Sequence, residues 1–189
     1  MAWPPRFIFI GGALTLDFTQ TGGEGWRSRW EGWHTPDDLA DWAAAAPWLG
    51  FRPAVDQADL AAARALRETL WTIASDQAQG QAPRPADMAL IEAWAKKPDP
   101  VPVWRNGRQA FEDGQPFAQV LSAVARDTIS LFGTERVQRF RKCANPNCYL
   151  MFVDTSRPGK RAWCTMDRCG NLMKAARHRA KTKGDDHVH

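Results

Sequence analysis

The chain has 189 residues, which is enough for one domain of medium size and a second, small one. Ten tryptophans, nine phenylalanines and a hydrophobic fraction of 44% supply a packed core and argue against a disordered chain. No apolar run approaches the length of a membrane span, which argues against an integral membrane protein.

The net charge of +4 combines two regions of opposite sign. From Arg136 to Lys183 there are 13 basic and two acidic residues, which sums to +11. The rest of the chain holds 12 basic and 19 acidic residues and sums to −7. A small module with such a positive charge attracts polyanions, and nucleic acid is the first candidate.

The first elements are expected to be short. Residues 6–10, followed by two glycines, predict a short buried strand that ends in a flexible turn. Residues 13–19 fit either a strand or a turn of helix. Residues 21–31 are rich in glycine and tryptophan and predict a surface loop. The apolar run at residues 7–14 is short and lacks a small-residue cleavage site, so we do not expect a signal peptide.

Four helices are predicted before the basic region. Thr35 followed by Pro36 is a typical helix start, because threonine is a good N-cap and proline fits the first helical position. Gly133 stands where a helix C-cap is expected. The four helices are predicted at residues 36–47, 56–79, 85–96 and 116–133.

A β-hairpin is predicted between the third and fourth of these helices. Asn106-Gly107 separates two short apolar runs, at residues 101–104 and 109–111. Asn-Gly is the strongest short signal for a two-residue hairpin turn.

All four cysteines lie within 27 residues near the C-terminus. They form two pairs, Cys143-x4-Cys148 and Cys164-x4-Cys169, with 15 residues between the pairs. Two close pairs joined by a short loop match the ligand spacing of a structural zinc site. Four thiolates complete a tetrahedron and leave no position for a catalytic water, so we predict one structural Zn²⁺.

Two other arrangements of the cysteines remain open. They could form two disulfides, or they could be unlinked thiols. Disulfides require an oxidising compartment, and the sequence shows no export signal, so we expect reduced cysteines and a cytoplasmic protein. The confinement of all four to one short segment argues against scattered core thiols.

The C-terminal segment resembles the CGNR zinc-finger family. Leu172 stands at the position of the signature arginine, which is the one departure from the four-residue motif. The matching residues are Cys143-x4-Cys148, Phe152, Asp154-Thr155-Ser156, Arg161, Trp163-Cys164, Met166 and Cys169-Gly170-Asn171.

Three segments of the N-terminal part carry a second resemblance. They are Gly11-Gly12-Ala13-Leu14-x-Leu16-Asp17-Phe18, Asp38-Leu39-Ala40-x-Trp42 and Ala65-Leu66-Arg67-Glu68. These segments are similar to the ABATE domain, which often precedes this finger. The resemblance implies a stress-responsive bacterial transcription regulator, in which the finger binds DNA and the ABATE domain senses a signal.

The expected fold class is α+β. A mainly helical domain with a few short strands is expected at residues 1–134. A small four-cysteine zinc finger, treble-clef-like or ribbon-like, is expected at residues 135–183 and should end in a basic helix. Residues 184–189 are expected to form a flexible tail.

The basic helix after Asn171 is the predicted nucleic-acid surface. The helix has basic residues at i, i+3, i+4 and i+7, namely Lys174, Arg177, His178 and Lys181, and this spacing places them on one face that can meet phosphates. Arg179, on the flank, is the candidate for reading bases. Two other readings remain open, a protein-interaction finger and a solvated face with no partner. The predicted nucleic-acid-binding residues are Arg161, Lys174, Arg177, His178, Arg179 and Lys181.

A ligand cleft is a second hypothesis, in the N-terminal region. Tryptophan and arginine suit aromatic or anionic ligands, and the candidates are Trp26, Arg27, Arg29 and Trp30. The alternative is that these tryptophans brace a glycine-rich loop against the helices. No Ser/His/Asp, Cys/His or phosphate-loop pattern is recognisable, so we do not expect an enzyme.

Overall fold

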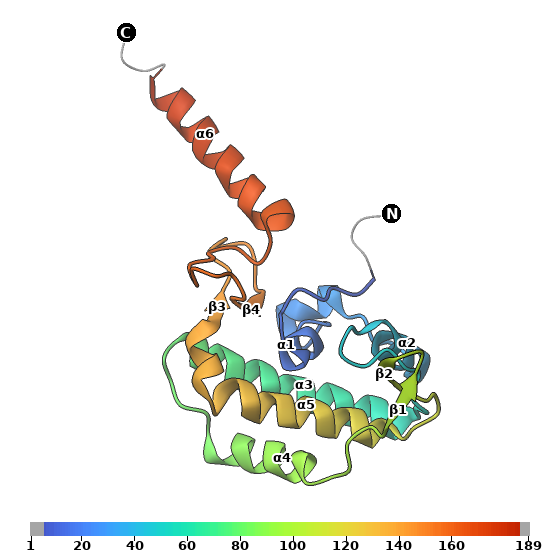
Figure 1. Ribbon diagram of the computed structural model, residues 1–189. Coiled ribbons are helices and arrows are strands. Elements are labelled where there is room, and N and C mark those ends of the chain that lie inside the picture. The colour runs from blue at the N-terminus through green and yellow to red at the C-terminus, as the bar shows by residue number, and fades with distance from the viewer. Residues whose placement is uncertain (1–5, 186–189) are drawn as a thin grey trace.

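The computed structural model describes residues 6–185, and within that range all side chains except those of residue 178 and residues 180–185. Helices dominate the described chain (Figure 1). They are α1 (Leu14–Thr19), α2 (Pro36–Ala45), α3 (Gln57–Ala78), α4 (Pro85–Ala95), α5 (Phe117–Phe132) and α6 (Asn171–Asp185). Two 3₁₀ helices, η1 (Gly25–Trp30) and η2 (Glu135–Arg139), and one π-helical turn, η3 (Met166–Gly170), complete the helical set.

The strands form two separate antiparallel hairpins. The first pairs β1 (Pro102–Arg105) with β2 (Arg108–Phe111), and the second pairs β3 (Phe140–Lys142) with β4 (Met151–Val153). This mainly helical α+β architecture confirms the predicted fold class. We use the name cysteine module for residues 135–185.

The helices predicted at residues 36–47 and 56–79 are confirmed as α2 and α3, and each begins with reciprocal capping. The Asp38 backbone N–H donates to Thr35 Oγ1 at 3.3 Å, and Asp38 Oδ2 accepts from the Thr35 backbone N–H at 2.8 Å. Asp56 and Asp59 repeat this arrangement at the start of α3. The helices at residues 85–96 and 116–133 are confirmed as α4 and α5.

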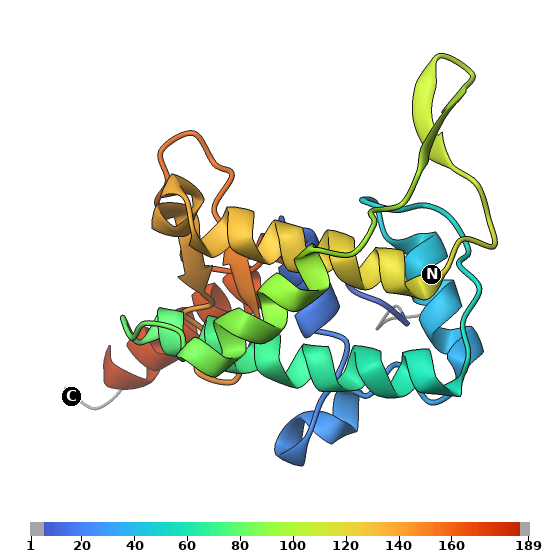
Figure 2. The same ribbon diagram turned by 90° about the horizontal axis from the view of Figure 1, so that it is seen from below.

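The predicted hairpin is also confirmed, and it projects from the helical body (Figure 2). Asn106 and Gly107 have φ angles of 50° and 75°, the left-handed conformation that a type I′ turn requires at both central positions. Trp104 on β1 is 83% exposed.

Two expectations for the first residues need correction. Residues 6–10 form no strand, and within the described chain no strand pairs with them. Instead, Phe7 and Phe9 pack against the helical core, so burial and not ladder hydrogen bonding holds this segment. Residues 13–19, which fitted either structure, contain helix α1, and the expected loop at residues 21–31 contains the 3₁₀ helix η1.

The main hydrophobic core lies among α1, α2, α3 and α5. Its centre is aromatic: Phe18 meets Trp33 and Trp42 edge to face, with ring centroids 4.8 and 5.3 Å apart. Figure 1 shows α3 and α5 side by side, with α4 on the far side of α5 from α1. All buried members of this cluster lie before residue 126.

The cysteine module packs on the helical part through two further hydrophobic clusters. One contains Leu16 and Leu131 from the helices and Met151 and Val153 from β4. The other joins Trp71 of α3 to the four cysteines and their neighbours. The two parts therefore share buried apolar surface.

Hydrogen bonds reinforce this junction. The Val153 backbone N–H donates to the Gly11 carbonyl at 2.7 Å, and Gln20 Nε2 donates to the Met151 carbonyl at 2.7 Å. Gly12 has a φ of 72° and lies against β4, where a Cβ atom would approach the Val153 carbonyl oxygen to 3.2 Å. A glycine is thus suited to this close approach.

Helix α6 runs through residue 185, so residues 184 and 185 are helical and not part of the predicted tail. The rest of that tail, residues 186–189, lies outside the described chain. No described helix combines the length and the apolar character needed to cross a membrane.

Candidate metal centre and nucleic-acid interface

The first cysteine pair lies on the turn that joins β3 to β4. The Cys143 backbone N–H donates to the Leu150 carbonyl at 2.9 Å, which continues the hairpin past the last ladder pair. Inside the turn, Asn145 Oδ1 accepts from the Asn147 backbone N–H at 3.0 Å. This local side-chain bond shapes the turn so that Cys143 and Cys148 reach the same side.

The second cysteine pair lies at the start of the C-terminal helix. Thr165 Oγ1 accepts from the Arg168 backbone N–H at 3.1 Å and caps the π-helical turn η3. Cys169 is in η3, which passes directly into α6 at Asn171. One cysteine pair therefore lies on a hairpin turn and the other at the start of a helix. Of the two predicted finger types, this arrangement is the treble-clef-like one.

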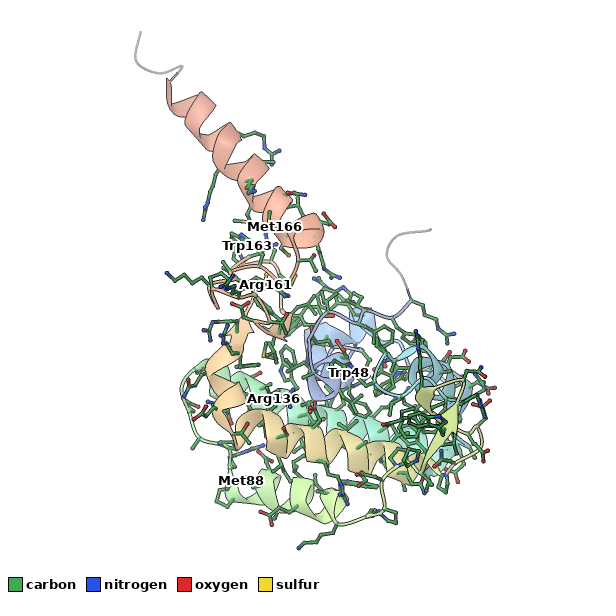
Figure 3. All side chains as sticks on the ribbon, viewed as in Figure 1. Trp48, Met88, Arg136, Arg161, Trp163 and Met166 are labelled. Carbon is green, nitrogen blue, oxygen red and sulfur yellow. The ribbon has the colours of Figure 1, made fainter. Side chains whose placement is uncertain are left out.

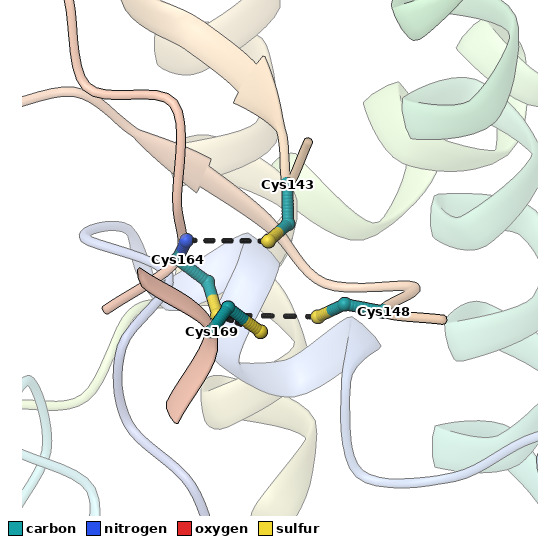
Figure 4. A group of neighbouring side chains, drawn as sticks. All are labelled: Cys143, Cys148, Cys164 and Cys169. Atoms are coloured by element: carbon teal, nitrogen blue, oxygen red, sulfur yellow. Dashed lines mark hydrogen bonds between the residues drawn. The ribbon is translucent and has the colours of Figure 1, made fainter. Parts of the chain in front are cut away.

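The four thiols converge on one point (Figure 4). All are buried, and their sulfur atoms lie within 4.8 Å of one another. The sulfur atoms of Cys164 and Cys169 are 3.6 Å apart, and those of Cys148 and Cys164 are 3.9 Å apart. A tetrahedral zinc ion with Zn–S bonds of about 2.3 Å requires sulfur–sulfur distances of about 3.8 Å, so this geometry fits zinc.

None of the four cysteines forms a disulfide, so the structure does not contain the alternative arrangement of two disulfides. The thiols lie close enough to interact, and the contact with Cys164 lowers the pKa of Cys148 to about 5. The close packing of four such groups favours a cation that accepts all of them as thiolates.

Two N–H groups point at the sulfur atoms from outside the cluster. Asn145 Nδ2 donates to Cys169 Sγ at 3.3 Å, and the Cys164 backbone N–H donates to Cys143 Sγ at 3.4 Å. N–H groups of this kind orient the thiolates and offset their negative charge. Asn145 was not among the predicted site residues; its only sequence signal is its place between two ligands.

The loop between the two cysteine pairs is held by Asp154. Hydrogen bonds from Ser156 and from the Arg161 backbone N–H lower the pKa of its carboxyl group to about 2. Although Asp154 is buried, these hydrogen bonds keep its carboxyl group ionised at neutral pH.

Arg161, which is predicted to bind nucleic acid, makes its described contacts within the cysteine module. Its Nε donates to the Trp163 carbonyl at 2.9 Å, its Nη2 donates to the Cys164 carbonyl, and its guanidinium lies 4.1 Å from the ring centroid of Phe152. These contacts hold Arg161 within the cysteine module. Figure 3 shows it with Trp163 at the base of α6.

Helix α6 projects away from the rest of the molecule (Figure 1). The side chains of Lys174, Arg177 and Arg179 are all exposed on it. The guanidinium of Arg177 lies 5.8 Å from the ring centroid of Trp163, and Trp163 packs against the cysteine cluster. The predicted residues His178 and Lys181 have side chains outside the described part of the structure.

The predicted ligand residues divide into two groups. Trp26, Arg29 and Trp30 line a cavity of about 470 Å³ together with Trp71 and other residues. Arg27 does not belong with them, because it is buried, pairs with Glu68 and stacks on Trp71 at 4.3 Å. It braces the loop instead of facing a ligand.

Trp33, the next tryptophan after Trp30 in the chain, is fully buried in the main core. Sequence reasoning missed Tyr149, which packs against Trp30 with ring centroids 4.5 Å apart. Tyr149 is the single tyrosine of the chain and follows the ligand Cys148 directly. Only the folded structure brings it to the tryptophans, which lie more than a hundred residues earlier.

Two protein-family models match the chain. The ABATE model, described as "Putative stress-induced transcription regulator", matches residues 12–135. The CGNR zinc-finger model matches residues 139–182. No curated protein matches the chain. Together with the geometry of the four thiols, the second match assigns one structural zinc ion to Cys143, Cys148, Cys164 and Cys169.

Proposed function

Because the chain belongs to the ABATE family, whose model is described as "Putative stress-induced transcription regulator", and its cysteine module is a CGNR zinc finger, we propose that it regulates transcription by binding double-stranded DNA through that finger. The observation that carries the proposal is the placement of α6, a basic helix that projects from the body and begins at the last zinc ligand. The helical ABATE part modulates the finger that it packs against.

The dimensions and charge of α6 suit DNA. Fifteen residues give a helix of about 22 Å, and the major groove is wide enough to admit a helix. Lys174 and Arg177 are exposed and three residues apart, so both can reach phosphates from one face. Arg179, which helical periodicity places on another face of α6 together with Met173 and Ala176, is the candidate for contact with base edges.

Zinc has a structural role in this proposal. Four thiolates complete its coordination, so it supplies folding energy and fixes the direction of α6, and it activates no water. Accordingly, we propose a regulator without enzymatic activity. The four reduced cysteines favour a cytoplasmic location.

A gel-shift titration of the full-length, zinc-loaded protein on duplex DNA tests the proposal. Binding is expected to weaken steeply between about 50 and 200 mM salt, because each phosphate contact releases counterions. Absence of duplex binding at low salt would reject DNA as the partner.

A protein-interaction adaptor is the second candidate, and two apolar side chains favour it. Leu172 is 59% exposed at the start of α6, where the family signature has arginine, and Met166 is exposed nearby on η3 (Figure 3). An apolar interface weakens little as salt rises, so the salt series separates the two functions.

A further inference from the structure

A cavity of about 630 Å³ lies where the ABATE part meets the zinc finger. Its walls come from both parts: Gln20, Arg29 and Trp30 from the first, and Tyr149, Arg168 and Leu172 from the second. Neither the zinc site nor the exposed face of α6 accounts for this cavity.

Two polar atoms of residues on the cavity wall are buried and lack hydrogen-bond partners among the described residues. They are Arg168 Nη1 and Gln20 Oε1. Buried polar groups in folded proteins are nearly always paired, so two of them at one cavity indicate a bound polar molecule.

The charges around the cavity favour an anion. Arg29 and Arg168 form no ion pair with a described carboxylate. The nearby acids are mostly engaged: Glu31 pairs with Arg67, and Asp38 pairs with Arg6. Asp167 is the one acidic wall residue without an ion pair in the described chain, which leaves two free positive charges against one negative charge.

The apolar part of the wall favours a flat ring. Trp30 and Tyr149 lie with ring centroids 4.5 Å apart and an interplanar angle of 34°, and the guanidinium of Arg29 lies 3.8 Å from the Trp30 ring centroid. Leu172 adds an exposed aliphatic edge. Because Arg29 and Tyr149 cover the Trp30 ring, a ligand ring would meet this aromatic pair at its edge, where a guanidinium lies beside it.

We propose that this cavity binds a small aromatic anion, with its acidic group on Arg168 and its ring against Trp30 and Tyr149. Its hydrogen-bond donors would meet Gln20 Oε1. The proposal stands apart from DNA binding, because none of these contacts uses the exposed basic face of α6. A ligand held here touches both parts of the protein at once.

Fluorescence titration with 1-anilinonaphthalene-8-sulfonate tests the proposal, because this probe carries aromatic rings and an acidic group. N-phenyl-1-naphthylamine has the same rings without the sulfonate and serves as the neutral control probe. The variant Arg168→Met is expected to weaken sulfonate-probe binding about tenfold or more, since a charge-assisted hydrogen bond is lost. Binding of the neutral probe should change less than twofold.

The matched control is Arg157→Met, which removes an exposed arginine from another loop of the same finger and should leave both probes unaffected. Zinc content and melting temperature verify that each variant is folded. If Arg168→Met fails to fold, the variant Tyr149→Phe replaces it in the test, and its affinity for the sulfonate probe is expected to be about two- to fivefold lower than that of the wild type.

Three results would overturn the proposal. Arg168→Met could bind the sulfonate probe as the wild type does, or it could lose both probes equally, which would indicate an apolar patch without anion recognition. Saturating duplex DNA could also displace the sulfonate probe while Arg168→Met weakens duplex binding by the same factor. That result would assign Arg168 to the DNA surface.

Discussion

The side-chain amide of Asn145 donates to Sγ of Cys169 at 3.3 Å, so a residue of the first zinc-binding turn supports the last ligand of the second pair. This bond crosses from the hairpin to the start of α6. Because α6 follows Cys169 with only Gly170 between them, the same contact also helps to set the direction of the basic helix.

Replacement of Asn145 by alanine is expected to lower zinc affinity by about tenfold or more, because residues that orient metal ligands contribute on this scale. Competition with the chromophoric chelator 4-(2-pyridylazo)resorcinol measures the loss. Asn147→Ala is the matched control, since its exposed side chain lies in the same turn. Equal zinc affinity in the two variants would contradict a role for the Asn145–Cys169 bond.

The double variant Lys174→Ala with Arg177→Ala is expected to weaken duplex binding on all sequences. For this variant, the slope of log affinity against log salt concentration should be shallower by about 2, close to one unit for each lost phosphate contact. The double variant Arg105→Ala with Arg108→Ala removes the same charge from the turn end of the β1–β2 hairpin and should keep the wild-type slope. Equal slopes in the two double variants would reject α6 as the DNA-binding surface.

Stability is expected to depend on pH through Asp17, which is 2% exposed. Burial raises the pKa of its carboxyl group to about 6, although hydrogen bonds from Trp48 and Gly11 oppose this rise. In the unfolded chain the pKa is about 3.9, so the folded state binds the proton more tightly. The resulting stabilisation is complete below about pH 4 and is lost as the pH rises through about 6.

Urea unfolding at about pH 5 and about pH 7.5 tests this dependence. The free energy of unfolding of the wild type should be about 1 kcal/mol higher at about pH 5 than at about pH 7.5, after subtraction of the same pH difference measured for Asp17→Asn, which cannot titrate at this position. Because both proteins bind zinc through the same thiols, their difference removes the contribution of the metal site. A difference that does not change with pH would contradict the raised pKa.

A fragment that ends at Gly133 is expected to fold cooperatively, with or without a chelator, because the main core lies entirely within it. It should be less stable than the full chain by roughly 2–4 kcal/mol, since Leu16 and Leu131 lose the cover of β4 and full burial of a leucine contributes about 1.5–3 kcal/mol. Circular dichroism during urea and thermal unfolding measures both the cooperativity and the stability of the fragment. A fragment without a cooperative transition would show that the two parts depend on one core.

The helices and the metal site could be predicted because their signals are local. Capping residues, apolar stripes and the Asn-Gly turn act within a few residues of the elements that they define. The cysteine spacing likewise places each pair on one short turn. The predicted boundary between residues 134 and 135 remains a prediction, and the shared clusters show why sequence spacing alone does not define it.

The errors and omissions come from contacts between distant segments. Residues 6–10 have the pattern of a strand, but their surroundings offer apolar packing and, within the described chain, no partner strand. Arg27 looks like a free cation in the sequence, whereas the carboxylate of Glu68, 41 residues later, pairs with it in the fold. The cavity at the junction is lined by residues drawn from both ends of the chain, so no local pattern could predict it.

The hydrogen bond between Gly11 and Val153 joins residues that are 142 positions apart in the chain. A ribosome that adds about 5–20 residues per second needs roughly 7–30 seconds to make the second partner after the first. During that time the turn at Gly11 and Gly12, and the face of α1 that carries Leu16, lack the cover of β4. The zinc finger is therefore the last part to complete the fold, and newly made chains pass through an interval in which Leu16 is only partly covered and the protein is more exposed to aggregation and proteolysis.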